Sequence, residues 1–160
     1  MEVQTVWIDT ECEAIVRLLH SAFADIARAM GITPENWPSY VAFITPERLL
    51  RQLGGKDADC LGIRADGAWV GFVAIAPYGK GYEITRLAVL PEYRHRGYGR
   101  RLMDAACDKA RARGLKEIGL GIMDANQALK RWYEAQGFVA GEPFTPPGLP
   151  FAVCGMLKKL

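Results

Sequence analysis

A basic turn interrupted by glycines, Arg94-His95-Arg96-Gly97-Tyr98-Gly99, has the residue types that could bind a phosphate group. It lies between an apolar run, Tyr82 to Leu90, and a helical pattern, Arg100 to Arg113. Backbone N–H groups at a helix N-terminus lack acceptors, and the helix dipole favours an anion there. Gly97 and Gly99 would let a ligand approach the backbone without meeting a Cβ. We therefore interpret the turn as a candidate anion site.

Two widespread phosphate-binding patterns are absent from the chain. A Walker loop requires serine or threonine after its glycine and lysine, but Asp57 follows Gly55-Lys56. A dinucleotide fingerprint requires a third glycine, and Asp124 stands at that place after Gly119-Leu120-Gly121. The sequence thereby disfavours nucleotide hydrolysis and dinucleotide redox chemistry. The turn does match the pattern Gln/Arg-x-x-Gly-x-Gly/Ala, which a basic, solvated surface loop would match equally well.

Apolar periodicity and turn residues predict the elements that position this turn. The expected helices run from the Asp9-Thr10 cap to Met30, from Thr45-Pro46 to just before Gly54, from Arg100 to Arg113 and from Asn126 to Gln136. The expected strands are Val3 to Ile8, Ala58 to Arg64, Trp69 to Ala76, Tyr82 to Leu90, Glu117 to Ile122, a strand beginning at Phe138 to Ala140, and Phe151 to Leu157. Hairpins come first and a strand–helix–strand crossover second. This order predicts an α/β (α+β) fold, a mixed, mostly antiparallel sheet of about six to seven strands with about four helices.

Composition and charge restrict the class of protein. The length of 160 residues predicts one domain. The net charge of +2 predicts no general attraction to nucleic acid. Four cysteines without a Cys-x-x-Cys pair, and only two histidines, predict core thiols and no metal site. No signal-peptide pattern opens the chain, and no apolar run reaches membrane-spanning length. We therefore expect a soluble, cytoplasmic protein without a membrane partner.

Two stretches together resemble the Gcn5-related N-acetyltransferases, the GNAT family. Ile84 to Gly99 is similar to the central strand, turn and helix start of that family, and Asn126 to Phe138 is similar to its second cofactor-side motif. The resemblance implies a GNAT-like fold with acetyl-CoA as co-substrate. It further implies a single acetyltransferase domain over residues 1–160. The acceptor-side helices and loop would occupy 1–57, the acetyl-CoA-binding core 58–140, and a C-terminal loop and strand 141–160.

The resemblance also implies which residues hold acetyl-CoA. Backbone groups of the central strand would pair with the pantetheine arm, and the basic turn would wrap the pyrophosphate, mainly through backbone N–H groups. Asn126, which is also a good helix N-cap, would face the cofactor. The side chains of the three strand residues would then belong to the core. The cofactor-binding residues expected in this way are Leu87, Ala88, Val89, Arg94, His95, Arg96, Gly97, Tyr98, Gly99, Arg100 and Asn126.

Acetyl transfer to an amine needs a base for the ammonium proton and an acid for the departing thiolate. By resemblance, Tyr133 is the candidate acid, although it could instead be an aromatic packing residue. Glu83 is the candidate base, acting directly or through water. It could instead lie at a solvent-exposed strand end, or pair with Arg86 or a lysine. His95 is expected in the anion loop rather than as the base.

The acceptor side carries fewer signals. Trp37, Tyr40, Phe43 and Phe144 could line an acceptor pocket, belong to the core, or form a homodimer contact. The function implied is acetyl transfer from acetyl-CoA to a primary amine of a small molecule or peptide by direct attack. An acyl-CoA-binding module without catalysis, acting as a sensor or docking a partner, is the alternative, and it would have no open acceptor cleft.

Overall fold

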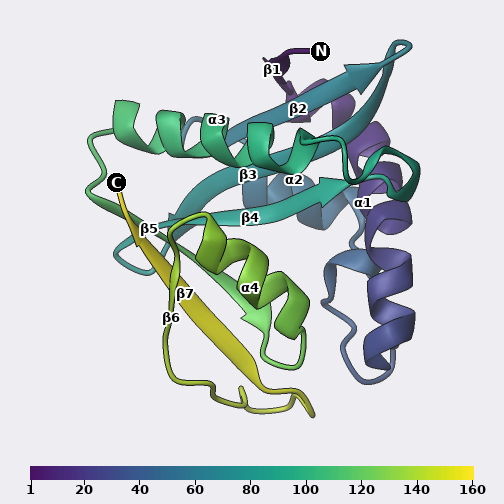
Figure 1. Ribbon diagram of the computed structural model, residues 1–160. Helices are drawn as coiled ribbons and strands as arrows, with labels where there is room; N and C mark the ends of the chain where they lie inside the picture. Colours follow the sequence, from purple (N-terminus) through teal and green to yellow (C-terminus); the bar gives the residue numbers. More distant parts are fainter.

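The computed structural model describes residues 1–160 and contains one sheet with helices on both faces (Figure 1). The strands are β1 Val3–Thr5, β2 Asp59–Ala65, β3 Ala68–Tyr78, β4 Gly81–Val89, β5 Glu117–Met123, β6 Val139–Ala140 and β7 Val153–Lys159. The α-helices are α1 Ile8–Met30, α2 Pro46–Leu53, α3 Tyr98–Ala112 and α4 Gln127–Ala135, and short 3-10 helices cover η1 Val41–Phe43 and η2 Pro91–Tyr93. The seven strands lie in the order β1-β2-β3-β4-β5-β7-β6, and only β4 and β5 are parallel. The predicted mixed, mostly antiparallel sheet with four helices is confirmed.

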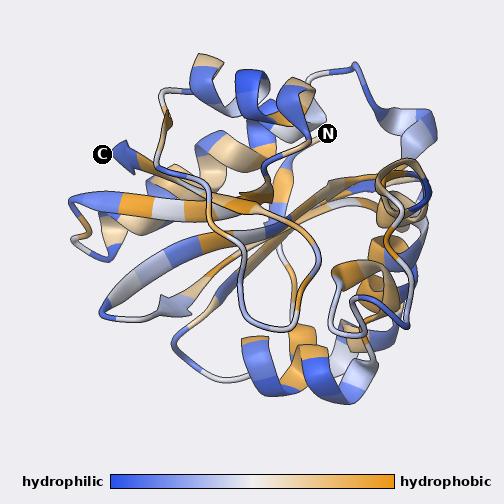
Figure 2. Cartoon of the chain, turned by 90° about the horizontal axis from the view of Figure 1, so that it is seen from below, coloured by the Kyte–Doolittle hydropathy of each residue, from blue (hydrophilic) through white to orange (hydrophobic).

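Each face of the sheet has its own hydrophobic core. Alternation along β3 sends Val73 and Ile75 toward α3, and Phe72 and Ala74 toward α1 and α2. The helices show the matching amphipathic pattern, with apolar and polar bands along each one (Figure 2). The four cysteines are buried free thiols, as predicted. No helix is both long enough and apolar enough to cross a membrane, and no group of acidic, histidine or cysteine side chains could hold a metal ion.

The boundaries of the first elements differ from the prediction. The opening strand ends at Thr5, and α1 begins at Ile8, before the predicted Asp9-Thr10 cap. Two hydrogen bonds support this earlier start: the Trp7 N–H donates to the Glu11 carboxylate at 3.1 Å, and the Glu11 N–H donates to the Trp7 carbonyl at 2.9 Å. The later caps agree with the sequence, since Thr45 caps α2 and Asn126 caps α4 through their side chains.

Strands β4 and β5 separate soon after they meet. Glu83 and Gly119 are their only paired residues, and β4 and β5 then run apart toward their carboxyl ends (Figure 1). On its other edge, β5 pairs with β7 along its whole length. Because the two strands diverge, backbone groups of β4 beyond Glu83 have no strand on that side.

A β-bulge interrupts β4 at the same place. Thr85 pairs with Ala74 and Ala88 pairs with Phe72, so two residues of β4 face a single residue of β3. The extra residue is Arg86, whose φ of 55° lies in the left-handed region that non-glycine residues rarely adopt. The bulge changes which face of the sheet the following side chains of β4 point to, at the place where the edge of β4 is not paired with β5.

Candidate active site

A cavity of about 800 Å³ opens where β4 and β5 diverge. Its walls come from α1, the loop before η1, β4, β5, α4 and β7, and most of the lining side chains are apolar. Glu83 and Arg86 are the only charged residues that line it. Asn126 and Tyr133 of the second motif line it as well, together with Leu87 of the central strand. A cavity of this size with few polar groups is typical of a small-molecule site.

The basic turn presents a row of free backbone donors. None of the N–H groups from His95 to Arg100 donates a hydrogen bond within the chain, and the first helical donor is Arg101, which donates to the Gly97 carbonyl at 3.1 Å. His95 and Gly97 have φ angles of 61° and 83°, which turn successive N–H groups toward one side. An added Cβ at Gly97 would meet no protein atom within 4 Å, so the space beside the turn is open. These residues fit an anionic ligand at the start of α3.

Arg94 is directed away from that space. Its guanidinium donates to the Asp25 carboxylate at 2.6 Å and to the Ala22 carbonyl at 2.7 Å, both on α1, and to the Val89 carbonyl at 3.1 Å. The Arg94 N–H is also used, by the Pro91 carbonyl at 3.3 Å. Arg94 therefore fastens the turn to α1, and the part of the predicted phosphate site that has free donors runs from His95 to Arg100.

The other side chains of the turn divide between surface and core. The side chains of His95, Arg96 and Arg100 are exposed, and the Arg96 guanidinium lies 5.3 Å from the ring centroid of Tyr93. Tyr98 is buried in the α3-side core. The turn also touches α4, because a Cβ added at Gly99 would lie 3.6 Å from the Trp132 ring. Trp132 is partly buried against the core.

The three strand residues of the predicted cofactor site are placed by the bulge. Ala88 is buried among the α1-side core residues, whereas Leu87 and Val89 pack against the α3-side core. Leu87 also lines the cavity. The packing interpretation of these side chains is therefore correct, and their backbone lies along the edge that β5 leaves open.

Helix α4 brings Asn126 and Tyr133 to the same wall. The Asn126 side chain accepts the Leu129 N–H at 3.2 Å, which completes the N-cap and leaves its amide N–H groups free. Tyr133 is buried, and its ring packs against Phe138 at a centroid distance of 5.7 Å. The Tyr133 hydroxyl makes no hydrogen bond, yet it is not among the fully enclosed unpaired polar atoms, so it opens on the cavity that Tyr133 lines. Burial raises the pKa of Tyr133, which keeps this hydroxyl protonated at neutral pH.

Glu83 lies inside the sheet rather than at a solvent-exposed strand end. It pairs with Ala76 of β3 and with Gly119 of β5, and its side chain is partly buried. It forms no ion pair with Arg86 or a lysine. Burial raises the pKa of the Glu83 carboxyl, and the charge of Arg86 opposes that rise. A carboxylate made more basic in a cavity is suited to accept a proton.

Three of the four aromatic residues singled out from the sequence reach the cavity. Trp37, Tyr40 and Phe144 line it, whereas Phe43 does not. Trp37 stacks on Phe151 of the proline-rich loop at 5.8 Å, which joins two segments far apart in the chain. Arg86 was missed as a site residue, although a charged residue three positions after Glu83 in an apolar strand was a signal of it.

The Acetyltransferase (GNAT) family profile matches residues 19–138. Streptothricin acetyltransferase from Streptomyces lavendulae is 34% identical over 89 residues, and the match covers 52% of this chain and 47% of that protein. The chain thus matches about half the length of that relative. N-alpha-acetyltransferase RimI from Mycobacterium tuberculosis is 28% identical over 129 residues, covering 78% of this chain and 75% of the relative.

Solved structures show the same fold. The PaiA N-acetyltransferase from Thermoplasma acidophilum, in complex with coenzyme A, superposes with a TM-score of 0.79 at 22% identity, over 99% of this chain and 98% of that chain. The ribosomal-protein-S18-alanine N-acetyltransferase from Escherichia coli gives a TM-score of 0.76 at 17% identity, over 98% and 92%. The profile covers most of the chain, and these two solved structures share its fold over nearly its whole length. The chain therefore belongs to the Acetyltransferase (GNAT) family.

Proposed function

We propose that this protein transfers an acetyl group from acetyl-CoA to a primary amine, by direct attack of the amine on the thioester. The observation that carries the proposal is the shared cavity, in which a carboxylate of raised pKa and a protonated tyrosine hydroxyl line one space. The amine would lose a proton and the thiolate would gain one, so the reaction needs one general base and one general acid. Named relatives act on streptothricin or on protein N-termini, so acceptors of both classes belong in the test.

Acetyl-CoA supplies an activated acyl group, and the chain's own residues offer it two kinds of contact. The free N–H groups from His95 to Arg100 would bind the pyrophosphate, and Asn126, the N-cap of α4, would face the cofactor in the cavity that it lines. The open edge of β4 at Leu87 to Val89 would pair with the extended pantetheine arm as a neighbouring strand would. Residues 58–140 would then form the acetyl-CoA-binding core, and 1–57 would contribute the acceptor side.

Glu83 would accept the proton of the bound ammonium group, directly or through one water. An alkylamine is almost fully protonated at neutral pH, so the nucleophile must be deprotonated within the complex. Partial burial raises the pKa of Glu83, and this makes its carboxylate a stronger base than an exposed one. Tyr133 would donate its proton to the departing sulfur, since no group in the chain competes for its hydroxyl.

The acceptor screen is the direct experiment. The protein is incubated with acetyl-CoA and a panel of amines, polyamines, amino acids, aminoglycoside-type antibiotics and peptides, and acetylated products are identified by mass spectrometry. We expect at least one acceptor to be acetylated by the native protein and far more slowly by Glu83→Gln. The non-catalytic acyl-CoA module is less favoured because it needs no open cleft, whereas this cavity is open. Tight acetyl-CoA binding without any acetylated product would support that module instead.

A further inference from the structure

Two of the partly buried arginines lack the carboxylate partner that the other partly buried arginines have. Of the five partly buried arginines, Arg64 pairs with Glu11, Arg94 with Asp25 and Arg113 with Asp59. Arg48 and Arg86 form no ion pair with any carboxylate of the chain. A guanidinium removed from water without a counter-ion is unfavourable, so this pair calls for a negatively charged ligand.

Arg86 owes its position to the bulge of β4. Residues three apart on a regular strand point to opposite faces, so Arg86 would lie across the sheet from Glu83. Cross-strand pairing places Glu83 opposite Ala76 and Thr85 opposite Ala74, on the α2 side of the sheet. The extra residue shifts the alternation by one, and Ala88 then returns to that same side. Arg86, two residues before Ala88, therefore shares a face with Glu83.

Contacts with α2 confirm that face. The Arg86 guanidinium donates to Gln52 Oε1 on α2 and to Thr85 Oγ1 at 3.1 Å. Both acceptors are neutral, and two of the five N–H groups of an arginine are thereby used. The Nε of Arg86 is buried without a hydrogen-bond partner, the one such side-chain atom in the chain. The guanidinium is therefore held in place without a direct ion pair, and only the nearby charge of Glu83 partly compensates its own.

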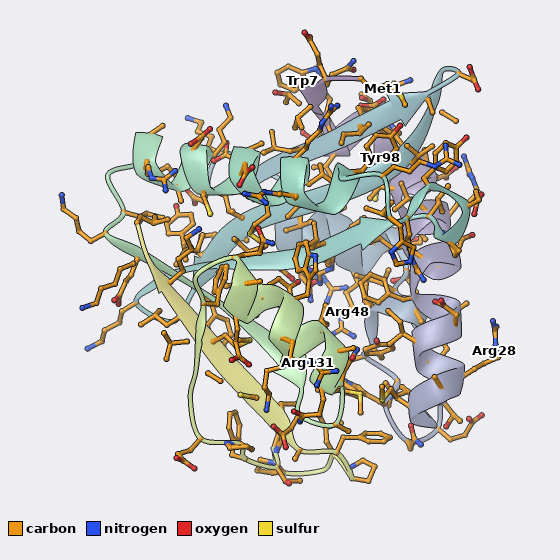
Figure 3. All side chains as sticks on the ribbon, in the orientation of Figure 1. Met1, Trp7, Arg28, Arg48, Tyr98 and Arg131 are labelled. Carbon is orange, nitrogen blue, oxygen red and sulfur yellow. The ribbon has the colours of Figure 1, made fainter.

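Arg48 adds a second cation beside it. Arg48 lies four residues before Gln52 on α2 and so on the same face of the helix. Arg86 contacts Gln52, so Arg48 lies one helical turn from that contact. Burial lowers the pKa of Arg86, the charge of Glu83 raises it, and the charge of Arg48 lowers it further. The Arg48 side chain makes no hydrogen bond, and Arg48 is not one of the residues that line the cavity. Figure 3 shows Arg48 between α1 and α4 in that view, whereas Arg28 projects away from the outer side of α1.

We propose that Arg86, together with Arg48, binds a carboxylate of the acceptor, and that the acceptor is an α-amino acid with an apolar or aromatic side chain. Guanidinium groups match a carboxylate in charge and in planar geometry. Glu83 would face the amine of the same molecule, and the aromatic walls at Phe23, Trp37 and Tyr40 would bind its side chain. This inference rests on the proposed acetyl transfer, which it extends to one class of acceptor.

The charge of the cavity argues against polycationic acceptors. Glu83 is its only carboxylate, so a polyamine would bring a second ammonium group to a site that already holds Arg86. A protein N-terminus carries no carboxylate next to its amine and would leave Arg86 uncompensated. A free amino acid supplies both charges at the separation of a single carbon atom.

The test compares acceptors that differ by one group. We measure kcat/KM for L-phenylalanine, L-phenylalanine amide, phenethylamine and spermidine as acceptors with saturating acetyl-CoA. We expect kcat/KM for the amino acid to exceed that for the amide or the amine by about 100-fold, as for a site built to bind the missing group. A preference for phenethylamine, the amide or spermidine over the amino acid would overturn the inference while leaving acetyl transfer in place.

Substitutions of single arginines test which of them bind the carboxylate of the acceptor. Arg86→Gln and Arg48→Gln should each lower the ratio of amino acid to amine kcat/KM about tenfold or more, mainly through KM. Arg51→Gln is the matched control, since Arg51 is exposed on the same helix and forms no ion pair, and it should leave the ratio unchanged. Arg48 makes no side-chain hydrogen bond, so its variant should fold even if the Arg86 variant does not. Unchanged ratios in Arg48→Gln and in a folded Arg86→Gln would refute the assignment.

A binding measurement separates this inference from the proposed function. Calorimetry with 3-phenylpropanoate, which has the carboxylate but no amine, requires no turnover. We expect it to bind the protein with coenzyme A present, and to bind at least tenfold more weakly to Arg48→Gln. If no amine is acetylated but this discrimination holds, acetyl transfer fails and the carboxylate site stands. If 3-phenylpropanoate binds no better than 3-phenylpropanol, the carboxylate site fails.

Discussion

The turn at His95 to Arg100 and the β4 segment around Glu83 and Arg86 offer a ligand different chemistry. The turn offers backbone N–H groups, while its arginine side chains are exposed or, in Arg94, bound to α1. The β4 segment offers side chains, a carboxylate and a guanidinium that a bulge brings to one face. A backbone site tolerates changes of side chain but needs particular backbone angles. A side-chain site changes its specificity with each residue, which fits a family whose members share a cofactor and differ in acceptor.

The largest effect is expected for Glu83→Gln. Loss of the base should lower kcat/KM for the amine by about 100-fold or more, with the acetyl-CoA Kd nearly unchanged. The base acts only when it is deprotonated, and burial raises the pKa of Glu83. As the pH is lowered, activity should therefore be lost earlier, at a higher pH, than it would be with an exposed carboxylate as the base. Steady-state kinetics across pH checks this, with the exposed Glu47→Gln as control. An unchanged pH–rate profile in the variant would remove Glu83 as the base.

Tyr133→Phe should have the next largest effect. The hydroxyl makes no hydrogen bond in the chain, so the variant keeps the ring packing and its melting temperature should stay within about 2 °C of the native value. Loss of the proton donor should lower kcat about 10- to 100-fold. Thiol release and acetyl-CoA calorimetry separate the two roles. A loss of acetyl-CoA affinity with kcat retained would make Tyr133 a binding residue instead.

Gly97→Ala tests the backbone character of the turn. With φ at 83°, alanine is strained by about 1 kcal/mol, and its Cβ would stand in the open space beside the free N–H groups. We expect acetyl-CoA to bind about tenfold more weakly, a cost of about 1.4 kcal/mol. Gly99→Ala is the matched control, because its Cβ would make only ordinary contact with Trp132. Equal losses in the two variants would mean that backbone angle is not what the site requires.

Arg94→Met should affect stability more than acetyl-CoA binding. It removes hydrogen bonds to the Ala22 and Val89 carbonyls and the pair with Asp25, so urea denaturation should show a loss of about 1 to 2 kcal/mol. Arg100→Met, on an exposed residue, should change stability by less than about 0.5 kcal/mol. If Arg94→Met instead retains stability and loses acetyl-CoA affinity, its side chain contacts the phosphates.

The smallest effect is the pH dependence that Asp25 contributes. The Arg94 guanidinium lowers the pKa of Asp25 below its ordinary value. The corresponding stability is present above the ordinary aspartate pKa and is lost as pH falls through the lowered one. The difference in unfolding free energy between the native protein and Arg94→Met should therefore shrink as pH falls through the lowered pKa of Asp25. A difference that stays constant down to acid pH would contradict this linkage.

The sequence was sufficient for the backbone site and for most of the elements. Glycines, caps and apolar periodicity are local signals, so the turn, α4 and the order of strands could be predicted from Gly97, Asn126 and their neighbours. The direction of the Arg94 side chain, toward α1, could not be predicted, because its partner Asp25 lies 69 positions away in the chain. The start of α1 was missed because Glu11 supports Trp7 across the helix end.

The acceptor side was harder to predict from the sequence, for a related reason. A bulge is defined by the register of two strands, so no local pattern places Arg86 beside Glu83. Trp37, which lines the cavity, and Phe151 meet only in the folded chain. Of the alternatives left open for Phe43, a place in the cavity wall does not apply, because Tyr40 lines the cavity and Phe43 does not.

One measurement tests the central claim most directly. Acetyl-CoA binding by calorimetry and amine-dependent thiol release are recorded on the same preparation, with apolar amino acids and amines as acceptors. The account predicts binding, thiol release that requires an amine, and loss of that release in Glu83→Gln while binding persists. Binding with no amine-dependent thiol release across the panel would contradict it, and would make the protein an acyl-CoA-binding module.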